Sequence, residues 1–236
     1  MFVLNCPYTY DSSLSEDLIK TVLSSDPFQL WLSELDSDVE LHNIHFQSVD
    51  RFGPRIGFVK FKADVSVKGV KVPGIVFCRG PAVAIFIILE CEGKEYVLLV
   101  EQARIPVGKS KVLEIPAGMI DERGVFKGTA AQEVQEETGI VINEEHLVDL
   151  YETVSNSRGA SFPGLYPSPG GCDEYIKLFL YKKHISSQDF SDLNGRLAGL
   201  QDHGEVITVK LVPLEDVVYV TNDAKALSAL LLYKYI

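Results

Sequence analysis

The period with which apolar residues recur changes along the chain. Residues 13–35 carry two short runs of helical period, separated at Asp26-Pro27, where the proline can open the second helix. From Val39 to Phe77, β-branched and aromatic residues alternate with polar ones, and glycines stand between the runs, which predicts the strands of a meander. We therefore predict an N-terminal helical appendage over residues 1–38 and a β-rich extension over residues 39–78.

The rest of the chain, residues 79–236, mixes strand and helix patterns and predicts an α+β fold. A loop with glycine and proline is expected over residues 105–118, and a helical turn from Pro213 to Val217. Thr129 with Gln132 suits a capping box, and Gly139 suits a left-handed C-terminal position, so a helix is predicted between them. Strands are predicted at 82–90, 95–104, 174–183 and 205–212, and a terminal amphipathic helix at 223–236.

Three carboxylates gather on the predicted helix before Gly139. With 3.6 residues per turn, Glu133, Glu136 and Glu137 share an arc of about 100° on one face. Such a triplet alone is most often only a solvated face, but like charges at this spacing destabilise a helix unless a positive group lies between them. Hard oxygen ligands on one face suit Mg²⁺ or Mn²⁺.

Composition and charge exclude several classes of protein. Of 236 residues, 22 are Lys or Arg and 33 are Asp or Glu, which gives a formal net charge of −11, and 46% are hydrophobic. This is a globular composition, and its acidity disfavours a nucleic-acid or anionic-membrane binder. The four cysteines form no CxxC pair, which argues against a zinc site. Free thiols, together with the lack of a basic leader segment, predict a cytoplasmic location.

The stretch from 118 to 140 resembles the Nudix box, a strand–loop–helix motif that binds divalent cations and a diphosphate. Two positions depart from the motif, Gly124 where Glu is expected and Gln132 where Arg is expected. In the family, the Glu and the Arg at these two positions mainly brace the loop against the helix. Because this chain lacks both of them, no unpaired charge is left behind, and we interpret the chain as a functional variant. The matching positions are Gly118, Glu133, Val134, Glu136, Glu137, Gly139 and Ile140.

The resemblance extends over most of residues 40–236, where the chain is similar to plant-type ADP-sugar diphosphatases and to the wider ADP-ribose diphosphatase group. It implies a Nudix α/β/α sandwich over residues 79–236 with an N-terminal β-rich extension. It also implies Mg²⁺-dependent hydrolysis of a nucleotide sugar, ADP-glucose or ADP-ribose, to AMP and a sugar phosphate. Relatives pair through their N-terminal strands, so a homodimer is expected.

The resemblance also implies roles for individual residues. The carboxylates Glu133, Glu136 and Glu137 and the backbone carbonyl of Ala117 would hold Mg²⁺, with Mn²⁺ as an alternative. Glu174 matches the loop carboxylate that acts as general base or orients water, with Asp173 as its competitor, so that Glu174 and Glu137 are the predicted catalytic residues. The predicted substrate-binding residues are Arg79 and Arg104, which would grip the diphosphate or terminal ribose, and Glu114, which would contact a substrate hydroxyl or the base.

Two alternatives stay open. The departures at Gly124 and Gln132 would also fit a catalytically weakened protein that binds an ADP-sugar as a sensor. Base selection depends on pocket residues that the sequence does not place, so a UDP-sugar diphosphatase is the second alternative.

Overall fold

The computed structural model describes residues 4–120, 126–156, 159, 162–199 and 206–236. The chain forms two compact units. The first, here called the extension unit, combines Met1–Pro81 with Ser168–Tyr175, and the second, the sandwich unit, combines Ala82–Pro167 with Ile176–Ile236. The predicted boundaries after residues 38 and 78 stay predictions.

A five-stranded sheet forms the extension unit. Its order is β1-β2-β3-β4, and β5 pairs with β3. Strand β1 runs parallel to β2, and the other pairs are antiparallel, so β2, β3 and β4 form the predicted meander. The elements are β1 (Tyr8–Tyr10), α1 (Glu16–Leu23), α2 (Asp26–Ser33), β2 (Val39–Phe52), β3 (Arg55–Val67), β4 (Val70–Val72) and β5 (Ile75–Cys78).

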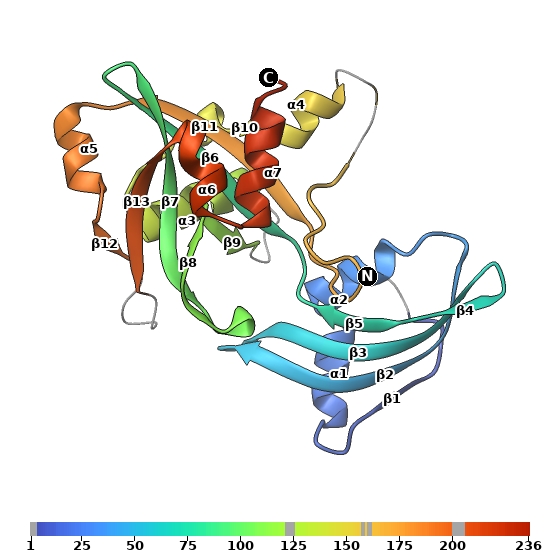
Figure 1. Ribbon diagram of the computed structural model, residues 1–236. Helices are drawn as coiled ribbons and strands as arrows, with labels where there is room; N and C mark the ends of the chain where they lie inside the picture. Colours follow the sequence, from blue (N-terminus) through green and yellow to red (C-terminus); the bar gives the residue numbers. More distant parts are fainter. Residues whose placement is uncertain (1–3, 121–125, 157–158, 160–161, 200–205) are drawn as a thin grey trace. The chain divides into compact units, whose positions relative to one another are not determined.

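The two predicted N-terminal helices are confirmed, and they pack against one face of this sheet (Figure 1). Helix α1 begins after Ser15, whose hydroxyl accepts a hydrogen bond from the Leu18 N–H at 3.2 Å, and α2 carries its proline in the first turn. Phe28 of α2 is fully buried against Phe46 and Phe61. The two helices and the sheet therefore share one core.

The sandwich unit is built on an eight-stranded mixed sheet. Its order is β10-β11-β6-β7-β13-β12, with β8 on β7 and β9 on β6, and only β11 and β6 run parallel. Its strands are β6 (Ala82–Cys91), β7 (Lys94–Arg104), β8 (Lys109–Glu114), β9 (Ala117–Met119), β10 (Val148–Asp149), β11 (Ile176–His184), β12 (Leu197–Ala198) and β13 (Ile207–Pro213). Its helices are η1 (Ile105–Val107), α3 (Phe126–Thr138), η2 (Glu144–His146), α4 (Leu150–Asn156), α5 (Ser187–Leu193), η4 (Leu214–Asp216), α6 (Val217–Val220) and α7 (Ala224–Tyr233).

Both faces of this sheet are buried, which gives the expected α/β/α layers (Figure 1). Residues of β6 alternate between two cores: Val83 and Ile85 face the core shared with α3 and α5, whereas Phe86 and Ile88 face the core shared with α4, α6 and α7. The fold class is thus α+β, a sandwich with an N-terminal β-rich extension. No helix among the described residues is long and apolar enough to cross a membrane.

Two local predictions were wrong. The expected loop over residues 105–118 contains η1, β8 and β9, because these short strands gain their hydrogen bonds from β7 and β6 and carry little apolar alternation of their own. Helix α3 begins at Phe126, so Thr129 and Gln132 lie inside the helix and form no capping box at its start. Its predicted end is confirmed, since Gly139 has a φ of +72° and donates its N–H to Gln135.

Candidate functional site

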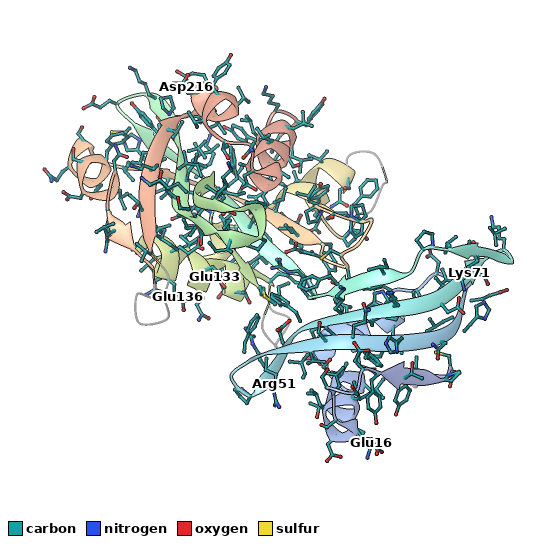
Figure 2. All side chains as sticks on the ribbon, turned by 60° about the horizontal axis from the view of Figure 1, so that its bottom comes forward. Glu16, Arg51, Lys71, Glu133, Glu136 and Asp216 are labelled. Atoms are coloured by element: carbon teal, nitrogen blue, oxygen red, sulfur yellow. The ribbon has the colours of Figure 1, made fainter. Side chains whose placement is uncertain are left out.

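Helix α3 and strand β9 bring two of the predicted metal ligands together. The Glu133 side chain lies so close to Gly118 that a Cβ atom there would overlap its carboxyl group. Glycine at 118 therefore leaves room for a carboxylate over the strand. Figure 2 labels Glu133 and Glu136, which both belong to this helix.

The carboxyl group of Glu137 is buried beside β9. It accepts a hydrogen bond from the Ala117 N–H at 3.3 Å, and the residue is only 6% exposed. Burial, followed by the negative charge of Glu133, raises the pKa of Glu137 to about 8. A group in this state releases its proton when a cation binds, so cation binding here is coupled to pH.

Glu136 has a different partner. Its carboxylate accepts a hydrogen bond from the Gln132 side-chain amide at 2.8 Å, one turn away on the same helix. Within the described part of the chain, no three His, Cys, Asp or Glu side chains gather closely enough to hold a metal ion. Glu133 and Glu137 converge on β9, and the metal-binding role of all three carboxylates stays a prediction.

The donors at this place fit a hard divalent cation. Glu133 and Glu137 supply carboxylate oxygens, the Ala117 carbonyl stays the predicted backbone ligand, and Gly118 leaves the space that a larger residue would fill. Oxygen donors of this kind suit Mg²⁺ or Mn²⁺ and do not suit a thiophilic metal. The position of Gly124 lies outside the described residues.

Arg104 and Glu114 form an ion pair beside this carboxylate pair. Arg104 donates from Nε to Glu114 at 2.5 Å and from Nη2 at 3.3 Å. Lys225 of α7 donates to the same carboxylate at 2.9 Å. Burial alone would raise the pKa of Glu114, but Arg104 and Lys225 outweigh it and hold that pKa below its usual value.

The charges of Arg104 and Glu114 also affect the pKa of Glu137. Its pKa responds to Arg104, which lowers it, and to Glu114, which raises it, so the ion pair and the carboxylate pair share one electrostatic environment. Lys225 was not among the sequence-predicted residues. Its neighbour Asp223 could be recognised as the cap of the terminal helix, but no local pattern reveals that Lys225 contacts β8.

The other two predicted residues lie together in the extension unit. Arg79 Nη2 is 3.2 Å from a carboxylate oxygen of Glu174, whose side chain is 12% exposed. The Arg79 guanidinium also lies over the Phe58 ring, 5.5 Å from its centre. The sequence did not predict this ion pair, and the substrate-binding role of Arg79 and the catalytic role of Glu174 stay predictions.

Asp173 has a separate environment. Its carboxylate accepts hydrogen bonds from the backbone N–H of Arg79 at 2.8 Å, from that of Gly80 at 3.2 Å and from the Cys78 thiol at 3.3 Å. Burial and then the nearby Asp173 charge raise the pKa of Cys78, so this thiol stays protonated and donates. Because its acceptor sites are occupied by these donors, Asp173 is suited to holding the loop in place.

Comparisons with known proteins bear on this arrangement. The NUDIX domain model matches residues 79–232. The chain is 44% identical over 234 residues to Nudix hydrolase 14, chloroplastic, from Arabidopsis thaliana, with 94% of this chain and 74% of that protein covered. It is 28% identical over 160 residues to the ADP-ribose pyrophosphatase of Bacillus subtilis, covering 68% of this chain and 69% of that protein.

A solved structure shares the fold. The crystal structure of an ADP compounds hydrolase superposes with a TM-score of 0.55 at 16% identity and covers 86% of this chain and 95% of that one. At this identity the likeness concerns the fold alone.

Proposed function

Because this chain belongs to the Nudix hydrolase family, we propose that it hydrolyses the diphosphate bond of an ADP-sugar, ADP-glucose or ADP-ribose, in a Mg²⁺-dependent reaction. The observation that carries the proposal is the convergence of Glu133 and Glu137 on β9, in the electrostatic environment of Arg104. Nudix hydrolases generally use divalent cations, and oxygen donors next to a guanidinium suit a charged diphosphate.

The reaction breaks a P–O bond of the diphosphate and forms a P–O bond to water, giving AMP and a sugar phosphate. A divalent cation bound by Glu133, Glu136, Glu137 and the Ala117 carbonyl would neutralise phosphoryl charge as it moves to the leaving phosphate. Arg104 would bind phosphate oxygens through the N–H groups that Glu114 does not use. Glu174, held by Arg79, would take the proton from the attacking water.

A homodimer is part of the proposal. One face of the extension sheet packs against α1 and α2, while its other face carries exposed aromatic and aliphatic side chains. A second copy of the chain would bury them. These side chains are Phe52, Ile75 and Phe77, which are 39%, 58% and 37% exposed.

All four cysteines are free, which supports the proposed cytoplasmic location.

A substrate panel tests the proposed activity. We expect the purified chain with Mg²⁺ to release AMP from ADP-ribose and ADP-glucose faster than UMP from UDP-glucose, and EDTA to abolish release. Faster UMP release would instead assign a UDP-sugar diphosphatase, and absence of nucleotide release from all three substrates would overturn the proposal.

A catalytically weakened binding protein is the second candidate. It is favoured by the hydrogen bond between Gln132 and Glu136, which turns one predicted ligand toward its own helix. Calorimetry with ADP-ribose separates the two candidates: micromolar binding without AMP release identifies a sensor, whereas turnover identifies the enzyme.

A further inference from the structure

The segment leading into α7 holds the end of β8 at three successive residues. Its contacts alternate between backbone and side chain, so that this end of the strand is fixed in both position and orientation. Thr221 donates its hydroxyl hydrogen to the Leu113 carbonyl, Lys225 donates from Nζ to the Glu114 carboxylate at 2.9 Å, and Asp223 accepts from the Ile115 N–H at 3.2 Å. We call Thr221, Asp223 and Lys225 the α7 clasp.

The charges of the clasp are buried and mutually satisfied. Asp223 also accepts from the Lys225 backbone N–H at 3.1 Å and from its Nζ at 2.8 Å. The exposed fractions of the side chains are 14% for Lys225, 7% for Asp223 and 6% for Glu114. A buried ammonium between two carboxylates keeps its charge, and it fixes the geometry of both.

The orientation of Arg104 depends on this arrangement. Glu114 takes the Nε and Nη2 edge of the guanidinium and is itself held from the other side by Lys225. A guanidinium has five N–H donors in a rigid plane, so fixing one edge aims the remaining donors. The Arg104 side chain is 41% exposed, which leaves those donors accessible to a ligand.

We propose that Lys225 is a positioning residue that acts through Glu114 to aim Arg104 at the substrate diphosphate. This inference rests on the proposed function for the identity of the ligand. It also changes the expected role of Glu114, whose carboxylate is occupied by two cations of the chain and therefore serves to hold Arg104 and does not contact a substrate hydroxyl.

The test compares two lysines that both pair with a carboxylate in the sandwich unit. Lys225→Met removes the contact to Glu114, and the control Lys182→Met removes a contact to Glu95. Glu95 lies nine residues before Arg104 on β7, which is roughly 30 Å of extended strand. With ADP-ribose and Mg²⁺, we expect Lys225→Met to raise KM by about ten- to hundredfold, the usual scale for a residue behind a binding group, and kcat to change less. Lys182→Met should leave KM unchanged.

Two further measurements separate positioning from general stability. In the Arg104→Ala background, Lys225→Met should raise KM no further, because its effect passes through Arg104. In ¹⁵N NMR spectra, the Arg104 Nε–H signal should shift and exchange faster with water in Lys225→Met and stay unchanged in Lys182→Met. If Lys225→Met does not fold, Glu114→Gln keeps the shape of the side chain, and the same changes in KM and in the NMR signal are expected.

A lower melting temperature with an unchanged KM and an unchanged Arg104 signal would overturn the inference and leave Lys225 a purely structural residue. An independent, additive KM effect in the Arg104→Ala background would also overturn it. If the wild type hydrolyses no nucleotide sugar, the proposed function fails, and the NMR signal still decides whether Lys225 orients Arg104.

Discussion

Two neighbouring carboxylates, Asp173 and Glu174, have different surroundings although they are adjacent in the sequence. Asp173 accepts hydrogen bonds from three donors in residues 78–80, two backbone N–H groups and one thiol, whereas Glu174 pairs with the Arg79 guanidinium. Glu174 stays the proposed general base and Asp173 its competitor, and their different partners allow substitutions to separate the two roles.

Substitution of each carboxylate by its amide tests this assignment. Glu174→Gln should lower kcat by roughly a hundred- to ten-thousandfold with KM nearly unchanged, because a general base acts only in the chemical step. Asp173→Asn retains an acceptor for the backbone N–H groups and should be mild, while Asp173→Ala should lower the melting temperature. Loss of turnover in Asp173→Asn with a mild effect of Glu174→Gln would reverse the two roles.

The proposed metal-binding role of Glu137 depends on the negative charge of its carboxylate. Glu137→Gln keeps the side-chain shape but removes a hard anionic ligand, so we expect kcat to fall by at least about a hundredfold. Millimolar Mg²⁺ should raise the melting temperature of the wild type, because it binds the folded state, and should do so less for the variant. Glu145→Gln, in the 3₁₀ turn after α3, is the matched control and should behave as the wild type. Normal turnover in Glu137→Gln would exclude the metal role.

At the scale of elements, the site depends on how closely α3 approaches β9. Gly118→Ala would place a methyl group against the Glu133 carboxylate, so the helix or the side chain must move. We expect a large loss of kcat and of Mg²⁺-dependent stabilisation. Gly69→Ala is the control: it has a φ of +76° in open space, so it should cost about 1 kcal/mol of stability by backbone strain but leave kcat intact. Wild-type turnover in Gly118→Ala would show that the contact is dispensable.

The docking of α7 onto β8 predicts a pH dependence of stability. Because the pKa of folded Glu114 lies below its usual value of 4.5, its contribution is present above that pH and is lost as the pH falls through the folded pKa. At pH 7, Glu114→Gln should reduce the free energy of unfolding by about 3–5 kcal/mol, since it leaves a buried Lys225 without this partner. Urea titrations should show the difference from the wild type shrinking below about pH 4. A difference that stays constant down to pH 3 would contradict this account.

At the scale of the whole molecule, the residues with proposed roles come from both units. Arg79 and Glu174 belong to the extension unit, and the other predicted site residues belong to the sandwich unit. The segment 168–175 joins the extension unit although the strands around it belong to the sandwich unit, because Phe77 pairs with Cys172 and Asp173 binds residues 78–80. Neither unit alone carries the full set of predicted residues.

The proposed homodimer makes a prediction at this same scale. Light scattering of the purified chain should give twice its mass of 26.2 kDa. Phe77→Asp places a charge on the exposed face of the extension sheet and should shift the protein toward the monomer. Asp17→Ser, an exposed position on α1, which covers the other face of this sheet, is the control and should leave the mass unchanged. A monomeric wild type would exclude the dimer.

The sequence by itself determined the elements whose patterns are local. The two N-terminal helices, the long strands β6, β7 and β11, and the glycine that ends α3 follow from periodicity, caps and backbone freedom, which act over a few residues. The spacing of Glu133, Glu136 and Glu137 likewise predicted a shared helix face, and Glu133 and Glu137 do converge on β9. These features need no knowledge of distant contacts.

Only the tertiary structure decided what pairs across the sequence. The short strands β8 and β9 depend on their pairing with β7 and β6, and one partner of Glu114 is Lys225, 111 positions away. The sequence assigned Asp173 and Glu174 as competitors for one role, and only the structure shows that the two carboxylates have different partners. The physical reason is that hydrogen bonding and burial of polar groups are properties of a three-dimensional neighbourhood, which a local pattern of residues does not contain.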